Sequence, residues 1–256
     1  MATFETEALV LKQFDLGEAD RLITLYTKEK GKLKAVAKGA RKGKKTRSGL
    51  VLPFSYHNFT LYQGRSLAKI NHIESIAMNS KLRDDLDYMA YASVVSEYIE
   101  RSGLEAEADQ ALFSLLAIIL EKMAQAKKNE LLFNFVIFKA KLLLLLGVKP
   151  EIENCTVCGK KVNLKKGAPL SVEEGGTICK NCFNQNEYYK STVFSLSEMR
   201  VLYKIIFAEI SQLKKARFSD QTLEKINKIT EKFLVYHLEL EPKSLSFLYT
   251  IRKMNN

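Results

Sequence analysis

The stretch from Gly31 to Leu50 reads GKLKAVAKGARKGKKTRSGL. In its first half, small or branched apolar residues alternate with lysines, which is the period-2 pattern of a β-strand with one buried face. The lysines on the opposite face are Lys32, Lys34 and Lys38. The second half predicts a glycine-containing flexible loop whose cations are Arg41, Lys42, Lys44, Lys45 and Arg47. Strand and loop together predict one continuous basic strip beside a packed core.

The strand pattern extends over the first part of the chain. Strand-like runs are separated by turn signals and cover residues 3–12, 21–28, 32–38, 50–62 and 66–74. Short strands at this spacing favour a five-stranded Greek-key β-barrel of the OB type, a scaffold that often binds single strands. An SH3-like barrel fits the strand count almost as well. We assign residues 1–80 to this barrel and expect it to bind DNA.

A helical period of about 3.6 residues replaces the strand period from Lys81 onward. Apolar residues recur at this spacing over 82–99, 112–123, 129–146 and 223–237, and Ser195 and Glu198 predict a capping box. Residues 81–150 and 190–256 are therefore expected to form one α-helical bundle, interrupted by an insertion at 151–189. The predicted fold class is α+β multidomain.

The insertion contains every cysteine of the chain. They form two C-x2-C pairs, Cys155 with Cys158 and Cys179 with Cys182. This spacing is typical of a four-thiolate zinc ribbon, in which the sulfurs complete a tetrahedron and leave no position for water. We expect one structural Zn2+ per chain. Free buried thiols or two disulfides are the alternatives, and a cytoplasmic location disfavours disulfides.

The charge of the chain points to a polyanionic partner. The 256 residues include 40 basic and 29 acidic side chains, for a net charge of +11, and residues 1–80 hold 14 basic against 7 acidic. Such an excess favours nucleic acid first and an anionic membrane second. The N-terminus lacks a signal-peptide pattern, and the most apolar stretch contains Asn134, Lys139 and Lys141. We therefore expect a cytoplasmic protein without membrane insertion.

Signals for catalysis are weak. Residues 43–46 resemble the end of a phosphate-binding P-loop, but Lys38 occupies the position of its first glycine. The histidines His57, His72 and His237 stand apart from one another and from the cysteines. We predict a protein that is not an enzyme. A zinc-supported nuclease, with carboxylates converging from different elements, stays the open alternative.

Aromatic side chains on the predicted barrel strands could stack on bases. The candidates are Tyr26, Phe54, Tyr56, Phe59 and Tyr62. Strand parity places Phe59 opposite the other candidates of its strand, so at least one set must pack in the core. Core packing is the better interpretation for any one of them. Residues 17–21 (GEADR) are interpreted as a turn with a local ion pair, with direct contact to DNA or a partner as the alternative.

Short segments along the chain form a series that resembles a known family. They are residues 11–12, 17–21 with Thr24, 31–32, 35–41, 53–54, 61–65, Pro150, 173–176 ahead of Cys179, 236–238 and 243–244. In this order they resemble the bacterial RecO family of recombination mediators. The resemblance covers essentially the whole chain, and the N-terminal run is its most specific part. Arg65, at the end of a matching strand, joins the expected DNA contacts.

The resemblance implies an OB fold, a helical domain and a zinc ribbon without enzymatic turnover. Similar proteins bind single- and double-stranded DNA, anneal strands coated by single-strand-binding protein, and with RecR help to load RecA in gap repair at the nucleoid. The resemblance also implies capture of the acidic tail of single-strand-binding protein by the helical domain, for which Arg200, Lys204 and Arg252 are candidates. A zinc-ribbon RNA-binding protein of translation or ribosome assembly stays the alternative.

Overall fold

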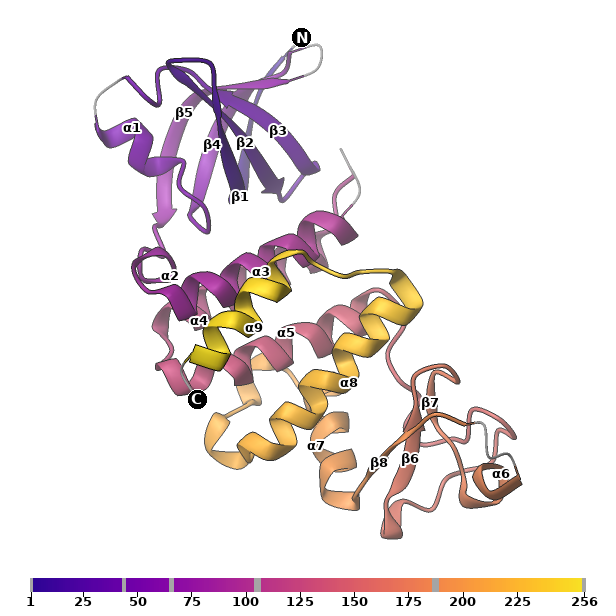
Figure 1. Ribbon diagram of the computed structural model, residues 1–256. Helices are drawn as coiled ribbons and strands as arrows, with labels where there is room; N and C mark the ends of the chain where they lie inside the picture. Colours follow the sequence, from indigo (N-terminus) through magenta and orange to yellow (C-terminus); the bar gives the residue numbers. More distant parts are fainter. Residues whose placement is uncertain (1, 43–44, 65–66, 104–106, 186–188, 255–256) are drawn as a thin grey trace. The chain divides into compact units, whose positions relative to one another are not determined.

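A computed structural model of the chain describes residues 2–42, 45–64, 67–103, 107–185 and 189–254. The chain divides into two compact units, Met1–Leu131 together with Pro242–Asn256, and Leu132–Glu241. The first unit contains a β-barrel and helices, and the second contains helices and the four cysteines (Figure 1). The division into 1–80, 81–150 with 190–256, and 151–189 stays a prediction.

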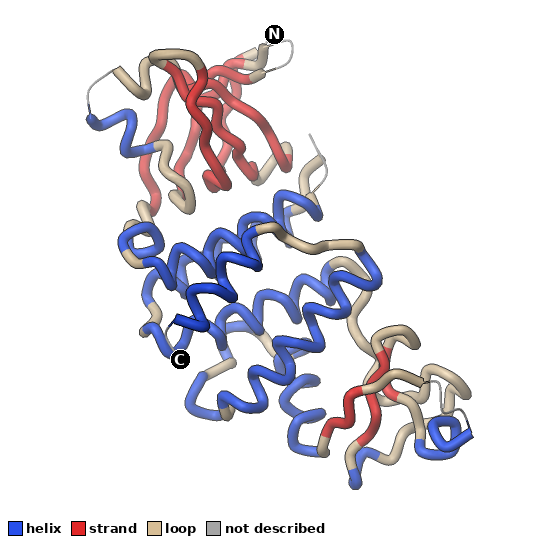
Figure 2. Tube along the Cα trace, in the orientation of Figure 1, coloured by secondary structure: helices blue, strands red, loops and turns tan. Residues whose placement is uncertain are grey.

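The strands of the first unit close into a barrel (Figure 2). They are β1 (Thr3–Leu16), β2 (Asp20–Thr27), β3 (Gly31–Ala37), β4 (Tyr56–Tyr62) and β5 (Ala68–Ala77). Their order is β1-β2-β3-β5-β4, and pairing of β1 with β4 closes the ring. Strands β3 and β5 pair in parallel, whereas the other neighbours pair antiparallel. Order and closure confirm the predicted OB-type barrel.

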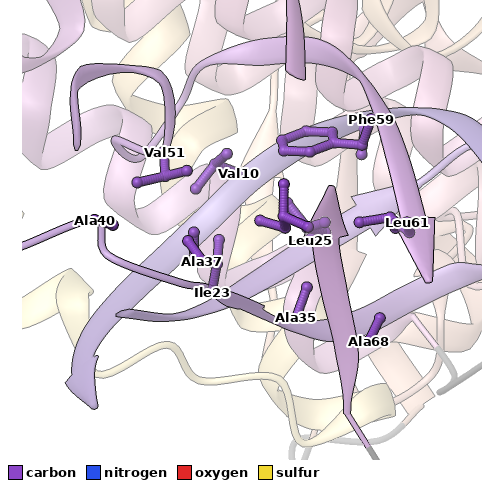
Figure 3. Close-up of a cluster of buried hydrophobic side chains, with 12 residues drawn as sticks. Val10, Ile23, Leu25, Ala35, Ala37, Ala40, Val51, Phe59, Leu61 and Ala68 are labelled. Atoms are coloured by element: carbon purple, nitrogen blue, oxygen red, sulfur yellow. The ribbon is translucent and has the colours of Figure 1, made fainter. Parts of the chain in front are cut away.

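Alternate residues of the strands fill the barrel. On β3, Ala35 and Ala37 are buried while Lys34 is exposed, as the period-2 pattern predicts. A bulge between Val10 and Lys12 shifts the register of β1, so Val10 lies in the core and Lys12 lies on the outer face. The core consists of Ala8, Val10, Ile23, Leu25, Ala35, Ala37, Ala40, Val51, Phe59, Leu61, Ala68 and Ile70 (Figure 3).

The segment between β3 and β4 differs from the prediction of a loop over 39–49 and a strand over 50–62. The structure has a turn through Lys42, the short helix α1 (Lys45–Leu50), and a strand that begins only at Tyr56. Burial explains the difference, because Ala40 and Val51 pack into the barrel core. Phe54 has φ of 69°, a left-handed conformation that no regular strand contains.

Helices complete the first unit. They are α2 (Lys81–Asp84), α3 (Leu86–Ser102), α4 (Gln110–Gln125) and α9 (Ser244–Met254), with a 3-10 turn η1 (Lys128–Glu130). The carboxylate of Glu97 on α3 accepts hydrogen bonds from the N–H groups of Lys243 (2.8 Å) and Ser244 (3.0 Å). A carboxylate at this position caps the helix and complements its dipole. It thereby holds the C-terminal helix to α3.

In the second unit, helices lie on both sides of the cysteine-containing insertion in sequence. They are α5 (Leu131–Leu145), α7 (Leu196–Phe207) and α8 (Asp220–Leu238), with 3-10 turns η3 (Ile210–Gln212) and η4 (Lys215–Arg217). The fully buried Lys139 of α5 donates to the carbonyl of Asn227 on α8 (2.7 Å), so α5 and α8 pack together. The capping box of Ser195 and Glu198 is present at the start of α7, which confirms that prediction.

The insertion itself is small and mostly irregular. It contains η2 (Leu164–Lys166), β6 (Ala168–Ser171), β7 (Gly176–Thr177) and α6 (Lys180–Gln185), and β8 (Thr192–Phe194) follows it. Strand β6 lies between β7 and β8 in a three-stranded sheet. Among the described helices of the whole chain, none has the length and apolar character needed to cross a membrane.

Candidate nucleic-acid interface and metal centre

The four cysteines come together in the second unit. Their sulfur atoms all lie within 4.8 Å of one another, and the Sγ atoms of Cys158 and Cys179 are 3.8 Å apart. A tetrahedron with metal–sulfur bonds of about 2.3 Å has edges of about 3.8 Å. All four are free thiols, so the structure gives no support to the two-disulfide alternative. The cluster could hold one metal ion.

Tight backbone turns position the sulfurs. Gly159 has φ of 72°, a conformation that favours glycine, and its N–H donates to the carbonyl of Cys155 (2.8 Å). The N–H of Cys179 donates to the Sγ of Cys155 (3.2 Å), which links the two pairs. Helix α6 begins directly after Cys179 and carries Cys182. The backbone therefore sets the positions of the ligands.

The thiol pKa values show how these surroundings favour a cation. Burial raises the pKa of Cys155, but the N–H groups of Cys179, Cys158 and Val157 that point at its sulfur outweigh burial and lower the pKa to about 6. Hydrogen bonding with the sulfurs of Cys158 and Cys179 raises the pKa of Cys182 to about 12. Four thiolates can share this space only when a positive ion compensates their charge.

In the first unit, the predicted basic strip begins on the outer face of β3. Lys34 is exposed there, and Lys38 is exposed in the turn that follows the strand. Lys32 is only partly exposed, and its Nζ donates to the carbonyl of Glu100 on α3 (3.0 Å). The alternation of β3 thus places Lys32 and Lys34 outside the barrel, and Lys38 is exposed in the turn after the strand.

The turn after β3 carries Arg41 and Lys42 beside acids at the end of β1 and in the turn that follows it. Arg41 donates to the carbonyl of Gly17 (2.5 Å) and lies 3.3 Å from the carboxylate of Asp15. Lys42 pairs with Glu18 at 2.7 Å. The loop itself contains no acid, and the two carboxylates come from the end of β1 and the turn that follows it. These ion pairs are exposed and stabilise by only about 0–1 kcal/mol.

Residues 17–21 also have a structural role. The carboxylate of Asp20 accepts a hydrogen bond from the N–H of Gly39 (2.8 Å), and Arg21 donates to Oε1 of Gln13 (2.9 Å). Both contacts hold the ends of β1, β2 and β3 together. They agree with the interpretation of this segment as a turn with local pairs.

Other predicted DNA contacts fall outside what is described. Lys44 and Arg65 lie outside the described residues, as do the side chains of Lys45 and Arg47. The backbone of Lys45 and Arg47 belongs to α1. Contact of these four residues with DNA stays a prediction.

An exposed aromatic residue lies on the outer face of the barrel, close to the strip. Phe14 is 55% exposed, and the Nζ of Lys12 lies 5.5 Å from the centre of its ring. Strand register places Phe14 beside Leu22 and Leu22 beside Val36, so an apolar row crosses β1, β2 and β3. Lys34 lies on the same face of β3, two residues from Val36. This face combines an aromatic ring with cations.

Comparisons with known proteins agree along the whole chain. The family model described as Recombination protein O N terminal matches residues 1–79, and the one described as Recombination protein O C terminal matches residues 83–246. The "DNA repair protein RecO" of Desulforamulus reducens is 31% identical over 255 residues, which cover 100% of this chain and 97% of that protein. The protein of the same name from Thermoanaerobacter sp. is 31% identical over 254 residues, or 99% and 100% of the two chains.

The chain belongs to the RecO family.

The RecO family consists of DNA repair proteins, which agrees with a barrel that carries a basic outer face. A third relative, the "DNA repair protein RecO" of Caldanaerobacter subterraneus, is 33% identical over 248 residues, covering 96% of this chain and 98% of that protein. The alternative of an RNA-binding protein of translation or ribosome assembly gains no support from these matches.

Core packing, the favoured interpretation of the aromatic residues on the predicted strands, is confirmed for three of them in this RecO-family barrel. Tyr26, Phe54 and Phe59 are buried, and Tyr56 packs edge-on against another ring at 5.9 Å. Phe14 was missed because the predicted strand stops at residue 12, whereas β1 continues to Leu16. The signal was present in the alternation of residues 12, 14 and 16, which share one face of a continued strand.

The cysteine cluster of this RecO-family chain predicts one bound metal ion per chain. Cys158→Ser and Cys179→Ser should each remove the ion, because each leaves only three thiolates. The metal should also be lost as the pH falls, since protons compete for the thiolates. Val157→Ser is the matched control, because Val157 lies between two ligands and is 43% exposed. Metal analysis of the purified chains measures the outcome. A folded wild-type chain without metal would contradict the assignment.

Proposed function

We propose that the outer face of the barrel binds the phosphate backbones of single- and double-stranded DNA. The observation that carries this proposal is the run of exposed cations at Lys34, Lys38, Arg41 and Lys42, along β3 and the turn that follows it. Contacts of this kind depend on charge and not on base sequence. The wider contact set that we propose also includes Lys32, Lys44, Lys45, Arg47 and Arg65.

The exposed ring of Phe14 supplies the second part of this interface. A base can stack on an exposed aromatic ring whatever its identity, whereas a paired base in a duplex does not present its face. The cation of Lys12, which lies beside the ring and also pairs with Glu100, can meet the neighbouring phosphate. Phe14 thereby gives single strands a contact that duplexes lack.

On this basis the chain acts as a recombination mediator that is not an enzyme. Cations between two phosphate backbones lower their repulsion, and the strands then pair through their own bases. Membership of the RecO family supports the further proposal that the protein works with RecR to help load RecA onto DNA coated by single-strand-binding protein. Such a protein would act in the cytoplasm, at the nucleoid.

We propose that the metal is a structural Zn2+. Soft thiolate ligands in a four-sulfur set favour zinc, and four protein ligands leave no position for a reacting water. The insertion contacts the helices of its own unit, since the ring Nε2 of His237 on α8 lies 2.8 Å from the carbonyl of Val172. Zinc would keep this part folded and would take no part in DNA chemistry.

We also propose that the second unit binds the acidic tail of single-strand-binding protein. A groove of about 410 Å³ on this unit supports this proposal. Val172, Val235 and Tyr236 line the groove with apolar groups. Lys190 and Lys232 supply cations, and Glu173 and Glu231 also line the groove, with the Nζ of Lys190 3.4 Å from the carboxylate of Glu173. An apolar-ended acidic peptide needs this combination. The candidates named from the sequence, Arg200, Lys204 and Arg252, are not among the residues that line it.

If the tail peptide binds in the groove, Tyr236→Ala should weaken its binding by about tenfold, because the substitution removes the ring that contacts the apolar end of the peptide. Tyr236→Phe keeps the ring and should bind normally. Fluorescence anisotropy of a labelled peptide measures the affinity. Equal binding by both variants and the wild type would remove the groove from the proposal.

The strip predicts a loss of DNA binding on charge reversal. Replacing Lys34, Lys38, Arg41 and Lys42 by Glu should weaken binding about tenfold or more for every sequence tested. The slope of log affinity against log salt should also shrink by about 3, at roughly 0.7 per lost single-strand contact. The measurement is a titration of labelled oligonucleotides at several salt concentrations.

The control for the strip carries the same change in charge. Lys160, Lys161, Lys165 and Lys166 are exposed on the cysteine-containing insertion, and their replacement by Glu should leave most of the affinity intact. An equal loss in both variants would show that net charge, and not the strip, governs binding.

Phe14→Ala should weaken binding of single strands by about 1–3 kcal/mol and leave duplex binding nearly unchanged, because only unpaired bases can stack on the ring. Phe14→Tyr keeps the ring and serves as the control. Thermal unfolding should hardly change, since the side chain is 55% exposed. An equal effect on single strands and duplexes would argue against stacking.

A further inference from the structure

Helix α7 in the second unit presents an unusual outer face. Met199, Leu202, Ile205 and Ile206 are buried on its inner side. The residues on the outer side are Arg200, Tyr203, Lys204 and Phe207, at the i, i+3, i+4 and i+7 positions that lie side by side on a helix. An amphipathic helix normally carries charged and polar residues on this side. Here it carries two aromatic rings and two cations.

The two rings lie in contact at the surface. The centres of Tyr203 and Phe207 are 4.6 Å apart, and the two residues are 42% and 43% exposed. The Nζ of Lys149, from the segment after α5, lies 5.4 Å from the ring centre of Phe207. These rings do not fill the core, because the inner residues of α7 already do so. Their exposure therefore calls for another explanation than packing.

The cations of this face are available to a ligand. Neither Arg200 nor Lys204 makes a side-chain hydrogen bond or ion pair with another residue in the part of the chain that the structure describes. The nearest acid in sequence, Glu198, is held by the capping contact with Ser195 and by Lys225 at 2.7 Å. Glu209, two residues beyond Phe207, acts electrostatically on Lys141, so the face itself keeps an excess of positive charge.

We propose that this face of α7 is a second binding site for single-stranded DNA, distinct from the barrel. Unpaired bases would stack on Tyr203 and Phe207, while Arg200, Lys204 and Lys149 meet the phosphates on either side. This site could bind DNA even if the barrel did not. Its role in the protein rests on the proposed function, the annealing of two strands. A protein that pairs two strands gains from holding one strand on each unit.

Charge and shape favour DNA over an acidic peptide as the occupant. Two rings in contact on an open helix face offer an extended aromatic surface, and every base has a π-face that can stack on it. An apolar-ended peptide is better served by the groove of about 410 Å³ that α8 and the cysteine-containing insertion line together. The same residues on α7 would give such a peptide no enclosure.

The test counts the strands that one chain binds. A short oligothymidylate titrated against the full-length protein should saturate at about two per chain, measured by native mass spectrometry. Tyr203→Ala combined with Phe207→Ala should reduce this to about one and weaken the remaining second-site binding by at least about tenfold. Arg200→Glu combined with Lys204→Glu should do the same and lower the salt dependence.

Two controls match these variants. Tyr203→Phe combined with Phe207→Tyr retains both rings and should behave as wild type. Lys228→Glu combined with Lys161→Glu changes the charge of the same unit by the same amount at other exposed positions and should retain two strands. Thermal unfolding of each variant is compared with the wild type, and the expected result is no shift for the exposed α7 residues.

The outcomes separate this proposal from the function proposed for the barrel. The α7 site would be overturned if the variant with Tyr203→Ala and Phe207→Ala still bound two strands per chain. It would also be overturned if the wild type, like this variant, bound only one strand per chain. Each result would leave barrel binding intact. A wild-type chain that binds no DNA would remove both proposals. Binding of an acidic peptide that depends on the rings, with DNA stoichiometry unchanged, would also overturn the site and reassign the face to protein docking.

Discussion

The hydrogen-bonded closure of the N-terminal barrel is the constraint on which the rest depends. Pairing of β1 with β4 fixes the register around the ring, and register decides which residues of each strand face the core. A slip of one residue on β3 would bury Lys34 in place of Ala35, at a prohibitive cost for an unpaired charge. The small core residues Ala35 and Ala37 and the exposed lysines beside them are therefore two results of one pairing.

In the second unit, too, the backbone fixes the positions of the functional side chains, which here are the four cysteines. Its four sulfurs are placed by backbone turns and by N–H groups that point at Cys155, so the metal centre is prepared by the chain itself. The buried Lys139 receives its partners from Asn227 and Glu231 on α8, which ties the helices on either side of the insertion.

The period of the apolar residues and the spacing of the cysteines made much of the fold and of the cysteine cluster predictable from the sequence. The alternation in residues 32–38 predicts the two faces of β3, and the C-x2-C pairs predict the sulfur cluster, because both signals are local. Contacts between distant segments were not predictable. Nothing near Arg41 and Lys42 indicates that Asp15 and Glu18 lie beside them. Nothing near Val51 indicates that it packs into the barrel core, so that the next strand begins only at Tyr56. Phe14 was missed for a simpler reason, since the length of β1 was underestimated.

The most direct test of the account is the rate at which complementary strands coated with single-strand-binding protein anneal, followed by fluorescence as salt is raised. We predict acceleration by the wild-type chain that fades with salt, and its loss when Lys34, Lys38, Arg41 and Lys42 are all replaced by Glu, because the repulsion between backbones is then no longer compensated. Acceleration of equal size by this variant, or a rate that is insensitive to salt, would contradict the claim that the barrel cations bring the strands together.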